Sequence, residues 1–482
     1  MVVLLLDCSS GVPQHLLVYL IMPRPALPRI RVLLSWSNAP RDGYIPEMTF
    51  IRLIAATAAL LGIVALGLVL DTPRVVESSE WTQYRSAATN NASVTSGLTE
   101  IRTGAIATAN QVRSTPVIAA GKMFVGNHDS GELQAFDLVT GALIWQQKAP
   151  NWVHSEMIYQ DGRIYVGFGN RLEPEWEPGD NRVRGLGESG LLSLDAATGK
   201  PLWRYDTEGA VMPTPALVDG SLYAVTGDKH LYELDPDTGE ERTVEALPNW
   251  VSMSSPAAAD GVLYFGGGST TPSRVYAYDT EAKDFAWRTE IPAATAGLDD
   301  VPPAVADGLV VTTLMHAVRD DADEIVGETH ELLALDAATG EIAWRHDLGS
   351  GPVGSNNRSG APMIDEGTVF VGSPTTKESY AYDLQSGEQL WHAPTGAVKG
   401  APATNGRSVY FGTVKGAVFA LDPRTGEIQG RVDLDGVLAP MGPVIVDGTK
   451  LVVASQNATI YILPIGGDGG FAGAEDGTTP GS

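Results

Sequence analysis

The 482-residue sequence holds one cysteine, Cys8, and few basic residues. A single cysteine excludes an intramolecular disulfide, and its place near the N-terminus excludes a zinc–thiolate site or thiol catalysis in the rest of the chain. Lys and Arg number 32 against 58 Asp and Glu, which gives a net charge of −26. Because so acidic a surface repels phosphate backbones, we expect no nucleic-acid partner.

Long apolar runs are also scarce, and the one of 18 uncharged residues is Leu53–Leu70. That length is about enough for a membrane-spanning helix. Arg41 and Arg52 precede the run and acidic residues follow Asp71, so the positive-inside rule sends the chain after Asp71 out of the cytoplasm.

The run is either an uncleaved anchor or a cleaved signal peptide, for which Ala65-Leu66-Gly67 offers a loose cleavage site. Met48 opens a natural signal start, so residues 1–47 are predicted to be a poorly structured or misassigned extension. An uncleaved helix predicts a single-pass protein of the cytoplasmic membrane with its body outside. A cleaved one predicts a secreted or periplasmic protein.

An internal repeat organises the remaining sequence. The motif Asp-x-x-Thr-Gly-x-x-x-Trp recurs seven times with a mean period of about 47 residues. Its aspartates are Asp137, Asp195, Asp235, Asp279, Asp336, Asp383 and Asp422. Five copies keep the tryptophan, namely Trp145, Trp203, Trp287, Trp344 and Trp391. Thr243 and Gly430 fill that slot in the other two copies.

A second module, an apolar run with a turn and a β-rich run, precedes each motif. Its turn glycines are Gly121, Gly162, Gly220, Gly261, Gly308, Gly367, Gly406 and Gly448. Eight modules against seven motifs leave the last unit, which stops at Pro464, without an outer strand. We expect the N-terminal stretch Leu98–Thr103 to supply that strand by pairing near Ala458–Leu463.

Each unit indicates four short strands, because Asp-Gly and Thr-Gly favour tight hairpin turns around alternating apolar residues. A four-stranded sheet cannot bury both faces alone, and radial closure removes its free edges. The sequence therefore predicts an all-β fold, an eight-bladed β-propeller of four-stranded antiparallel blades after one hydrophobic N-terminal helix. The aspartate should close its turn locally, and the tryptophan should wedge between blades and donate its N–H.

The predicted chain has five parts and forms a monomer. They are the extension (1–47), the signal anchor or signal peptide (48–71), a linker (72–80), the propeller (81–464) and a disordered, acidic, Gly-rich tail (465–482).

The repeat resembles that of the pyrroloquinoline-quinone (PQQ) type, eight-bladed quinoprotein-like propellers. The segment Glu80-Trp-Thr-Gln-Tyr-Arg85 is similar to the Trp-x-x-Phe-Arg start common in that superfamily. The resemblance implies the propeller fold over about 81–464. It also implies relatives of three kinds: quinone-dependent alcohol dehydrogenases, the propeller lipoprotein of outer-membrane barrel assembly, and non-catalytic surface or sensor propellers. Function must be argued from a site, not from the fold.

A quinoprotein dehydrogenase would need PQQ and calcium. For calcium the resemblance implies Glu156, Asn249 and Asp299, and for catalysis Asp299, Asp300 and Arg358. Residues 81–482 lack the vicinal Cys-Cys pair and the Cys-x-x-Cys-His motif of such enzymes. PQQ and calcium therefore belong only to this alternative.

Polar and aromatic residues replace the repeat consensus in several segments that lead into innermost strands. We expect them at one mouth of the central channel, where they bind a ligand or partner or else hydrogen-bond the loop backbones. These residues are Trp152, His154, Glu156, Asn249, Trp250, Asn356, Asn357 and Arg358.

Two further motifs have ordinary structural interpretations. Gly126-Asn127-His128-Asp129 matches a metal-binding turn of phosphatases, but without the rest of that motif series it predicts a surface turn. The pattern Gly185-x-Gly187-x-x-Gly190 matches a dinucleotide fingerprint, yet it lies in an insertion, Arg171–Gly190, and opens no helix.

We thus expect an exported, membrane-tethered or secreted propeller that acts as a non-catalytic binding or assembly scaffold. Its partner, a protein or a small molecule, would bind at the propeller face. A PQQ- and calcium-dependent dehydrogenase of an alcohol or sugar is the alternative.

Overall fold

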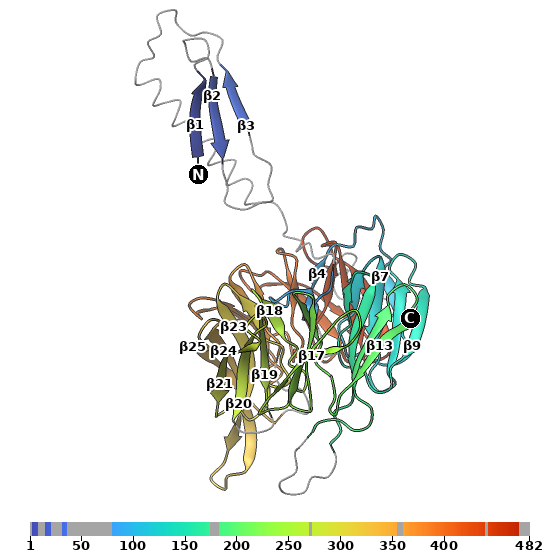
Figure 1. Ribbon diagram of the computed structural model, residues 1–482. Helices are drawn as coiled ribbons and strands as arrows, with labels where there is room; N and C mark the ends of the chain where they lie inside the picture. Colours follow the sequence, from blue (N-terminus) through green and yellow to red (C-terminus); the bar gives the residue numbers. More distant parts are fainter. Residues whose placement is uncertain are drawn as a thin grey trace, which may run out of the picture. The chain divides into compact units, whose positions relative to one another are not determined.

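A computed structural model describes residues 2–7, 15–20, 31–35, 80–173, 183–268, 272–353, 360–438 and 442–471. The chain forms two compact units, Met1–Thr72 and Pro73–Ser482. The first holds an antiparallel sheet of β1 (Val2–Asp7), β2 (His15–Leu20) and β3 (Arg31–Ser35), where the sequence predicted little structure (Figure 1).

The predicted helix Leu53–Leu70 lies outside the described residues. Within them, no helix is both long and apolar enough to cross a membrane.

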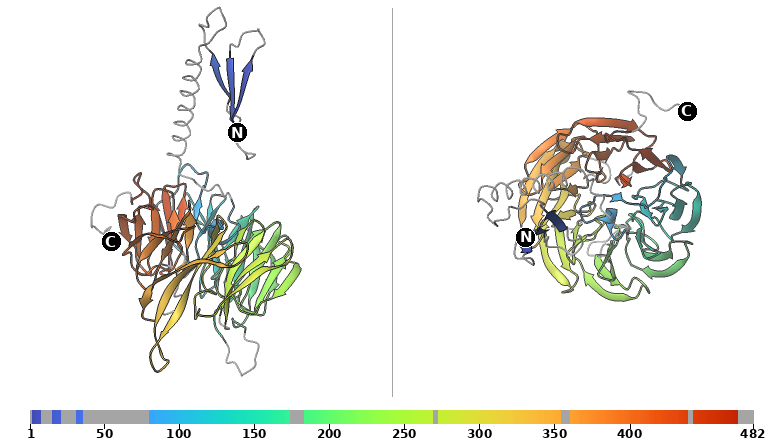
Figure 2. Two further views of the ribbon diagram at one scale, coloured as in Figure 1. Left: turned by 90° about the vertical axis from the view of Figure 1, so that its left-hand side faces the viewer. Right: turned by 90° about the horizontal axis from the view of Figure 1, so that it is seen from above.

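The second unit is the predicted eight-bladed propeller, an all-β ring seen end-on in Figure 2. Blade 1 comprises β6 (Val117–Ala119), β7 (Lys122–Gly126), β8 (Glu132–Asp137) and β9 (Leu143–Lys148). Blade 2 comprises β10 (Ile158–Gln160), β11 (Arg163–Phe168), β12 (Gly190–Asp195) and β13 (Pro201–Asp206). Blade 3 comprises β14 (Ala216–Val218), β15 (Ser221–Val225), β16 (His230–Leu234) and β17 (Glu241–Ala246). Blade 4 comprises β18 (Ala257–Ala259), β19 (Val262–Gly267), β20 (Ser273–Asp279) and β21 (Asp284–Ile291).

The other four blades follow in chain order. Blade 5 comprises β22 (Ala304–Ala306), β23 (Leu309–Arg319), β24 (Ile325–Asp336) and β25 (Ile342–Gly351), and its two middle strands extend into a long hairpin (Figure 1). Blade 6 comprises β26 (Met363–Asp365), β27 (Thr368–Gly372), β28 (Ser379–Asp383) and β29 (Gln389–Ala393). Blade 7 comprises β30 (Ala403–Thr404), β31 (Val409–Gly412), β32 (Ala417–Leu421) and β33 (Ile428–Asp433). Blade 8 comprises β4 (Ser93–Val94), β34 (Val444–Val446), β35 (Lys450–Ser455), β36 (Thr459–Pro464) and β5 (Gly104–Ala107).

The two kinds of predicted hairpin turn lie on one face of the ring, which we call the turn face. The eight module glycines have φ between +62° and +81°, and in blade 3 Asp219 also has a positive φ, as a type I′ turn requires. In the Asp motif, Asp336 Oδ1 accepts hydrogen bonds from the Thr339 amide (2.8 Å) and hydroxyl (3.0 Å), and these bonds lower the pKa of Asp336. The predicted local closure of the turn is confirmed.

The motif tryptophans join neighbouring blades as predicted. Trp344 Nε1 donates to the Leu384 carbonyl (2.9 Å) of the next blade, immediately after the next motif aspartate. The other four tryptophans repeat this contact, Trp145 with Ala196, Trp203 with Pro236, Trp287 with Ala337 and Trp391 with Pro423. The five indole rings are half-buried or buried. Each tryptophan lies on the fourth, outer strand of its blade, so the contact between blades lies toward the outside of the propeller.

The N-terminal segment closes the ring, but with a different strand from the one predicted. β5, Gly104–Ala107, pairs antiparallel with β36, and β4 pairs parallel with β34 at the opposite edge of the same blade. Leu98–Thr103 instead crosses from one edge to the other. Leu98 packs against blade 1, and the Arg102 amide donates to the Leu138 carbonyl (3.3 Å). Because Leu98–Thr103 contacts blade 1 in this way, the strand that pairs with β36 is β5.

Residues 465–471, which the sequence assigned to the tail, contact the propeller. Ile465 bridges to Phe471, and the Tyr410 hydroxyl donates to the Gly469 carbonyl (2.6 Å). The aromatic ring of Phe471 lies 6.0 Å from that of Tyr410, so residues 465–471 belong to the propeller. Residues 472–482 lie outside the described part.

Residues 81–94, which we call the channel segment, run past the innermost strands of seven blades and include the 3₁₀ turn η1 (Tyr84–Ser86). Its contacts follow the ring in order, Trp81 with Tyr159, Thr82 with Leu217, Gln83 with Ala258, Ala88 with Val305, Thr89 with Ile364, Asn91 with Thr404 and Ala92 with Ile445. Figure 2 shows the blue segment inside the ring. The Trp-x-x-Tyr-Arg start is therefore the part of the chain that ties the blades together at the centre.

Candidate functional site

The loops opposite the turn face form the loop face, and side chains from four blades gather at its mouth. We call Arg113, His128, Trp152, His154, Arg184, Trp250 and Asp299 the mouth cluster. Direct contacts join them in two groups, Arg113 with His128, Trp152 and His154, and Arg184 with Trp250 and Asp299. The charge of Arg184, which lowers the pKa of His154, relates the second group to the first.

Two buried histidines form the blade 1 and blade 2 side of the mouth cluster. The rings of His128 and His154 meet edge to face at 4.0 Å between centroids, and Trp152 lies 4.7 Å from His128. Burial, together with neighbouring arginines, lowers the pKa of His128 to about 4 and that of His154 well below its usual value. Both imidazoles are therefore neutral at pH 7, each with one N–H to donate.

The backbone fixes this pair. The loop leading into blade 2 lies so close to blade 1 that a Cβ on Gly126 would be 2.3 Å from Val153 Cγ1. The Trp152 carbonyl accepts the Gly169 amide (3.0 Å). The position of His154 thus depends on close backbone packing that the glycine permits.

Arg184 comes from the insertion of blade 2 and reaches across the mouth. Its amide donates to the Gly227 carbonyl (2.9 Å) and its carbonyl accepts the Ala210 amide (2.7 Å), both in blade 3. The guanidinium lies 5.8 Å from the ring of Trp250, and Nη1 is 3.6 Å from Asp299 Oδ2. The side chain therefore brings a positive charge from blade 2 to blades 4 and 5.

Asp299 is a buried carboxyl group on a fixed backbone. Its carbonyl accepts the amides of Ser252 (3.0 Å), Met253 (2.7 Å) and Ser254 (2.9 Å). Burial, and then the negative charge of Asp300, raise the pKa of Asp299 to about 7, while Arg184 opposes the rise. A carboxyl group with such a pKa exchanges protons near neutral pH, as a general base or acid requires.

Glu156 turns toward the channel segment. It is 1% exposed, and its Oε2 accepts the amide of Arg85 (3.0 Å). Burial raises its pKa. Glu156 therefore hydrogen-bonds the backbone of the channel segment at the centre of the propeller. This is the structural role, hydrogen bonding to the backbone, that the sequence offered as the alternative to ligand binding.

The calcium donors implied by the PQQ resemblance do not come together. Asn249 Oδ1 accepts hydrogen bonds from Tyr276 (2.6 Å) and Arg274 (3.1 Å), Asp299 faces Arg184, and Glu156 faces the channel segment. Among the described residues, no group of three or more His, Cys, Asp or Glu could hold a metal ion. Asn356, Asn357 and Arg358 lie outside the described residues.

Sequence reasoning found part of the mouth cluster. Trp152, His154, Trp250 and Asp299 were expected, whereas Arg113, His128 and Arg184 were not. The turn predicted at His128 is present and Asp129 is exposed on it, but the His128 side chain is only 3% exposed and packs against the rings of Trp152 and His154. One feature of the sequence could have indicated Arg184: it lies in an insertion, Arg171–Gly190, that makes this repeat longer than the others.

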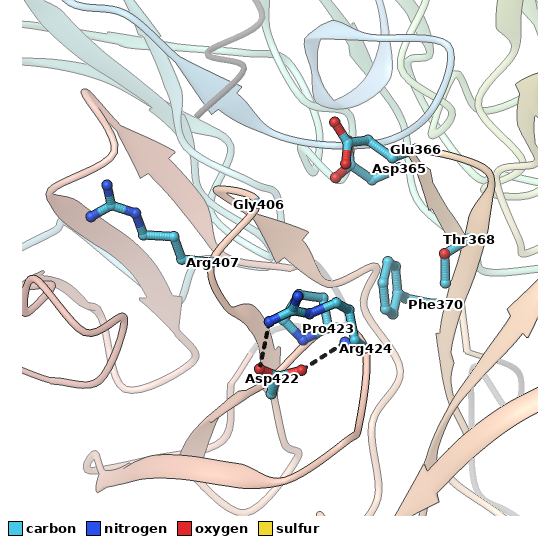
Figure 3. A pocket seen from close by; sticks show the side chains of 9 residues that line it. All are labelled: Asp365, Glu366, Thr368, Phe370, Gly406, Arg407, Asp422, Pro423 and Arg424. Carbon is cyan, nitrogen blue, oxygen red and sulfur yellow. Dashed lines mark hydrogen bonds and ion pairs between the residues drawn. The ribbon is translucent and has the colours of Figure 1, made fainter. Parts of the chain in front are cut away.

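A hollow of about 410 Å³ lies on the turn face between blades 6 and 7 (Figure 3). Its lining is Asp365, Glu366, Thr368, Phe370, Gly406, Arg407, Asp422, Pro423 and Arg424. Arg424 is 89% exposed and lies 4.0 Å from Asp422. Charges paired this loosely in solvent bind ligands weakly, so the mouth cluster is the stronger candidate site.

An eight-bladed ring of Asp-x-x-Thr-Gly-x-x-x-Trp repeats, with tryptophans wedged between blades, defines a PQQ-like β-propeller. The family model described as outer membrane protein assembly factor BamB matches residues 81–186, 178–268 and 243–465. The chain belongs to that family.

Curated relatives carry more than one function. Tetrathionate hydrolase of Acidithiobacillus ferrooxidans is 30% identical over 348 residues, which cover 69% of this chain and 68% of that protein. Outer membrane protein assembly factor BamB of Shewanella oneidensis is 24% identical and covers 73% of this chain and 85% of its own. The crystal structure of BamB from Moraxella catarrhalis matches with a TM-score of 0.55 at 19% identity, covering 75% and 99% of the two chains, and it shows the fold alone.

Proposed function

We propose that this chain is an extracytoplasmic hydrolase that acts on a sulfur oxyanion of the tetrathionate class at the mouth cluster. The observation that carries the proposal is a buried carboxyl group, Asp299, with a pKa of about 7 and Arg184 at 3.6 Å. The similarity to tetrathionate hydrolase over two thirds of both chains supports it.

The chemistry of hydrolysis assigns a role to each group. Near pH 7 about half of the Asp299 side chains are deprotonated, so Asp299 can accept the proton of a water molecule that attacks a sulfur atom of the S–S chain. The S–S bond then breaks, thiosulfate leaves, and the hydroxyl group stays on the other fragment as HO–S–SO3−. Arg184 attracts an oxyanion to the same place, and its positive charge stabilises negative charge that develops during the reaction. The region after Leu53–Leu70 is taken to be outside the cytoplasm, either tethered by that segment or released.

The test is turnover of tetrathionate by the full chain, followed as loss of tetrathionate and appearance of thiosulfate. Asp299→Asn keeps the size of the side chain but removes the base, so kcat should fall by roughly a hundredfold or more. Circular dichroism and the melting temperature should stay near wild type. An unchanged rate in Asp299→Asn, or no turnover by the wild type, contradicts the proposal.

The pH profile gives an independent check. Because a base works when deprotonated, kcat/KM should rise with pH and level off above about 7. Asp300→Asn removes the negative neighbour that raises the pKa of Asp299, so the rise should move to lower pH. A profile identical in wild type and Asp300→Asn would mean that another group titrates.

A protein-binding scaffold is the second candidate, and one surface feature favours it. Apolar side chains are exposed on the outer strands of five blades, namely Leu143 (50%), Leu202 (46%), Ile342 (42%), Leu390 (48%) and Ile428 (43%). Such a belt suits a protein partner, as does the similarity to BamB. Co-purification with an outer-membrane assembly complex, without tetrathionate turnover, would favour this function over the hydrolase.

A further inference from the structure

His154 lies between positive charges on both sides of the mouth. The side chain is 3% exposed, and neither ring nitrogen has a hydrogen-bond partner among the described residues. Arg113, Arg171 and Arg184 all lower the pKa of His154, so all three guanidinium groups are near it. Leaving a buried polar group without a partner is costly, so a buried imidazole without one points to a missing ligand or water.

Two of these guanidinium groups, those of Arg113 and Arg171, also act on His128 and on each other. Arg113 and Arg171 are half-exposed at the loop face. Arg113 Nη1 lies 3.5 Å from His128 Nε2, and its buried Nε atom has no acceptor. Within the described part of the chain, Arg171 makes no hydrogen bond and no ion pair.

Among the described residues, Asp129 is the carboxylate whose charge acts on Arg113 and His128. Its oxygens contact His128 Nδ1 and the side-chain amide of Gln111 instead of pairing with either arginine. Among these described groups, two guanidinium groups against one carboxylate leave an excess positive charge. In a chain whose net charge is −26, that excess marks a place where an anion is attracted.

We infer that Arg113 and Arg171 form a second anion position, so that the mouth takes an elongated ligand with a negatively charged group at each end. One end binds at Arg184 beside Asp299, and the other binds at Arg113 and Arg171. His154, whose two ring nitrogens have no partner among the described residues, lies between the ends and offers its N–H group to the ligand. The N–H of His128 is directed at Asp129. The inference rests on the proposed function only for the placing of the reacting end at Asp299.

Binding of a long and a short anion tests the inference. In full-length Asp299→Asn, which prevents turnover, isothermal titration calorimetry gives Kd values for tetrathionate and for thiosulfate. Tetrathionate should bind at least about tenfold more tightly, since its second charged end gains charge-assisted hydrogen bonds and tenfold corresponds to about 1.4 kcal/mol. Adding Arg113→Gln and Arg171→Gln together should bring the ratio of the two Kd values close to one.

Two controls separate this effect from a folding defect. Arg171→Gln alone removes a side chain without partners in the described residues, so it should weaken tetrathionate binding and leave the melting temperature unchanged. Arg204→Gln removes a guanidinium that is paired with Glu188 and Asp206 outside the mouth cluster, and it should leave the Kd ratio as it was.

The outcomes also separate the inference from the proposed function. An unchanged Kd ratio in the double variant overturns the second anion position, even where the wild type hydrolyses tetrathionate. Wild-type turnover that Arg184→Gln alone abolishes, while Arg113→Gln and Arg171→Gln leave KM unchanged, also overturns it. If neither anion binds to the Asp299→Asn protein, both proposals fail.

Discussion

The glycine of each Asp-x-x-Thr-Gly motif meets two requirements in different blades. Gly387 has φ +70°, which its own turn in blade 6 needs, and a Cβ placed there would lie 2.8 Å from the ring of Trp344 in blade 5. The same approach recurs at Gly199, Gly239, Gly340 and Gly426, each against the tryptophan of the preceding blade. One residue type therefore shapes the turn and admits the wedge between blades.

Gly387→Ala should destabilise the propeller more than Gly367→Ala. Both positions have a positive φ, so both variants carry a similar backbone cost of about 1–2 kcal/mol. A Cβ at Gly367 has no atom within 4 Å, whereas one at Gly387 collides with Trp344, which should add about 1–3 kcal/mol. Urea unfolding of the two variants measures the difference. Equal losses of stability would show that the tryptophan moves aside without cost.

Single residues are predictable from the sequence where the repeat supplies several copies. Seven aspartates and five tryptophans in one register are enough to predict the turns and the wedge. His128 shows the limit, because its turn resembles a surface turn and only the packing of Trp152 and His154 from the next blade buries it. Contacts between non-equivalent loops leave no periodic signal.

At the scale of elements, the channel segment is held mainly by Arg85. This fully buried side chain donates from Nε to the Asn90 carbonyl and from Nη2 to the carbonyls of Pro402 and Pro443, each at 2.9 Å. The last two carbonyls precede the innermost strands of blades 7 and 8. Arg85 also lies beside Glu156 and lowers the pKa that burial raises.

Arg85→Met should destabilise the protein by about 3–5 kcal/mol, because it leaves buried carbonyls without donors and Glu156 without its nearby positive charge. Arg431→Met serves as the control, since Arg431 is 55% exposed and paired with Asp433, and its loss should cost less than about 1 kcal/mol. Thermal unfolding of both variants decides the matter. A small shift for Arg85→Met would mean that the channel segment is dispensable for the ring.

Counting elements predicted ring closure but not the closing strand. Eight turn modules against seven motifs required a borrowed strand, and β5 supplies it. The register was wrong by a few residues, because Leu98 and Arg102 contact blade 1 before the chain reaches β36. The path of the channel segment could not be predicted from the sequence, because its contacts are with seven blades that follow it in the sequence.

At the scale of the whole molecule, the site combines parts that the repeat does not specify. The loops into blades 2, 4 and 5 were expected to converge, and His154, Trp250 and Asp299 do lie at one mouth. Arg184 joins them from an insertion of blade 2, and Glu156 faces the centre of the ring instead. The arginines at the mouth contrast with the net charge of −26 of the chain, so the mouth is a place where an anion is attracted.

The most direct test of the account locates the anion itself. A crystal of the full-length Asp299→Asn protein soaked in tetrathionate would show the anomalous scattering of the ligand's sulfur atoms. If the mouth cluster binds an elongated anion, we expect sulfur peaks at the loop face in a row past His154, with one end near Arg184 and the other near Arg113 and Arg171. Sulfur peaks at the turn-face hollow between blades 6 and 7, and none at the mouth cluster, would contradict the account.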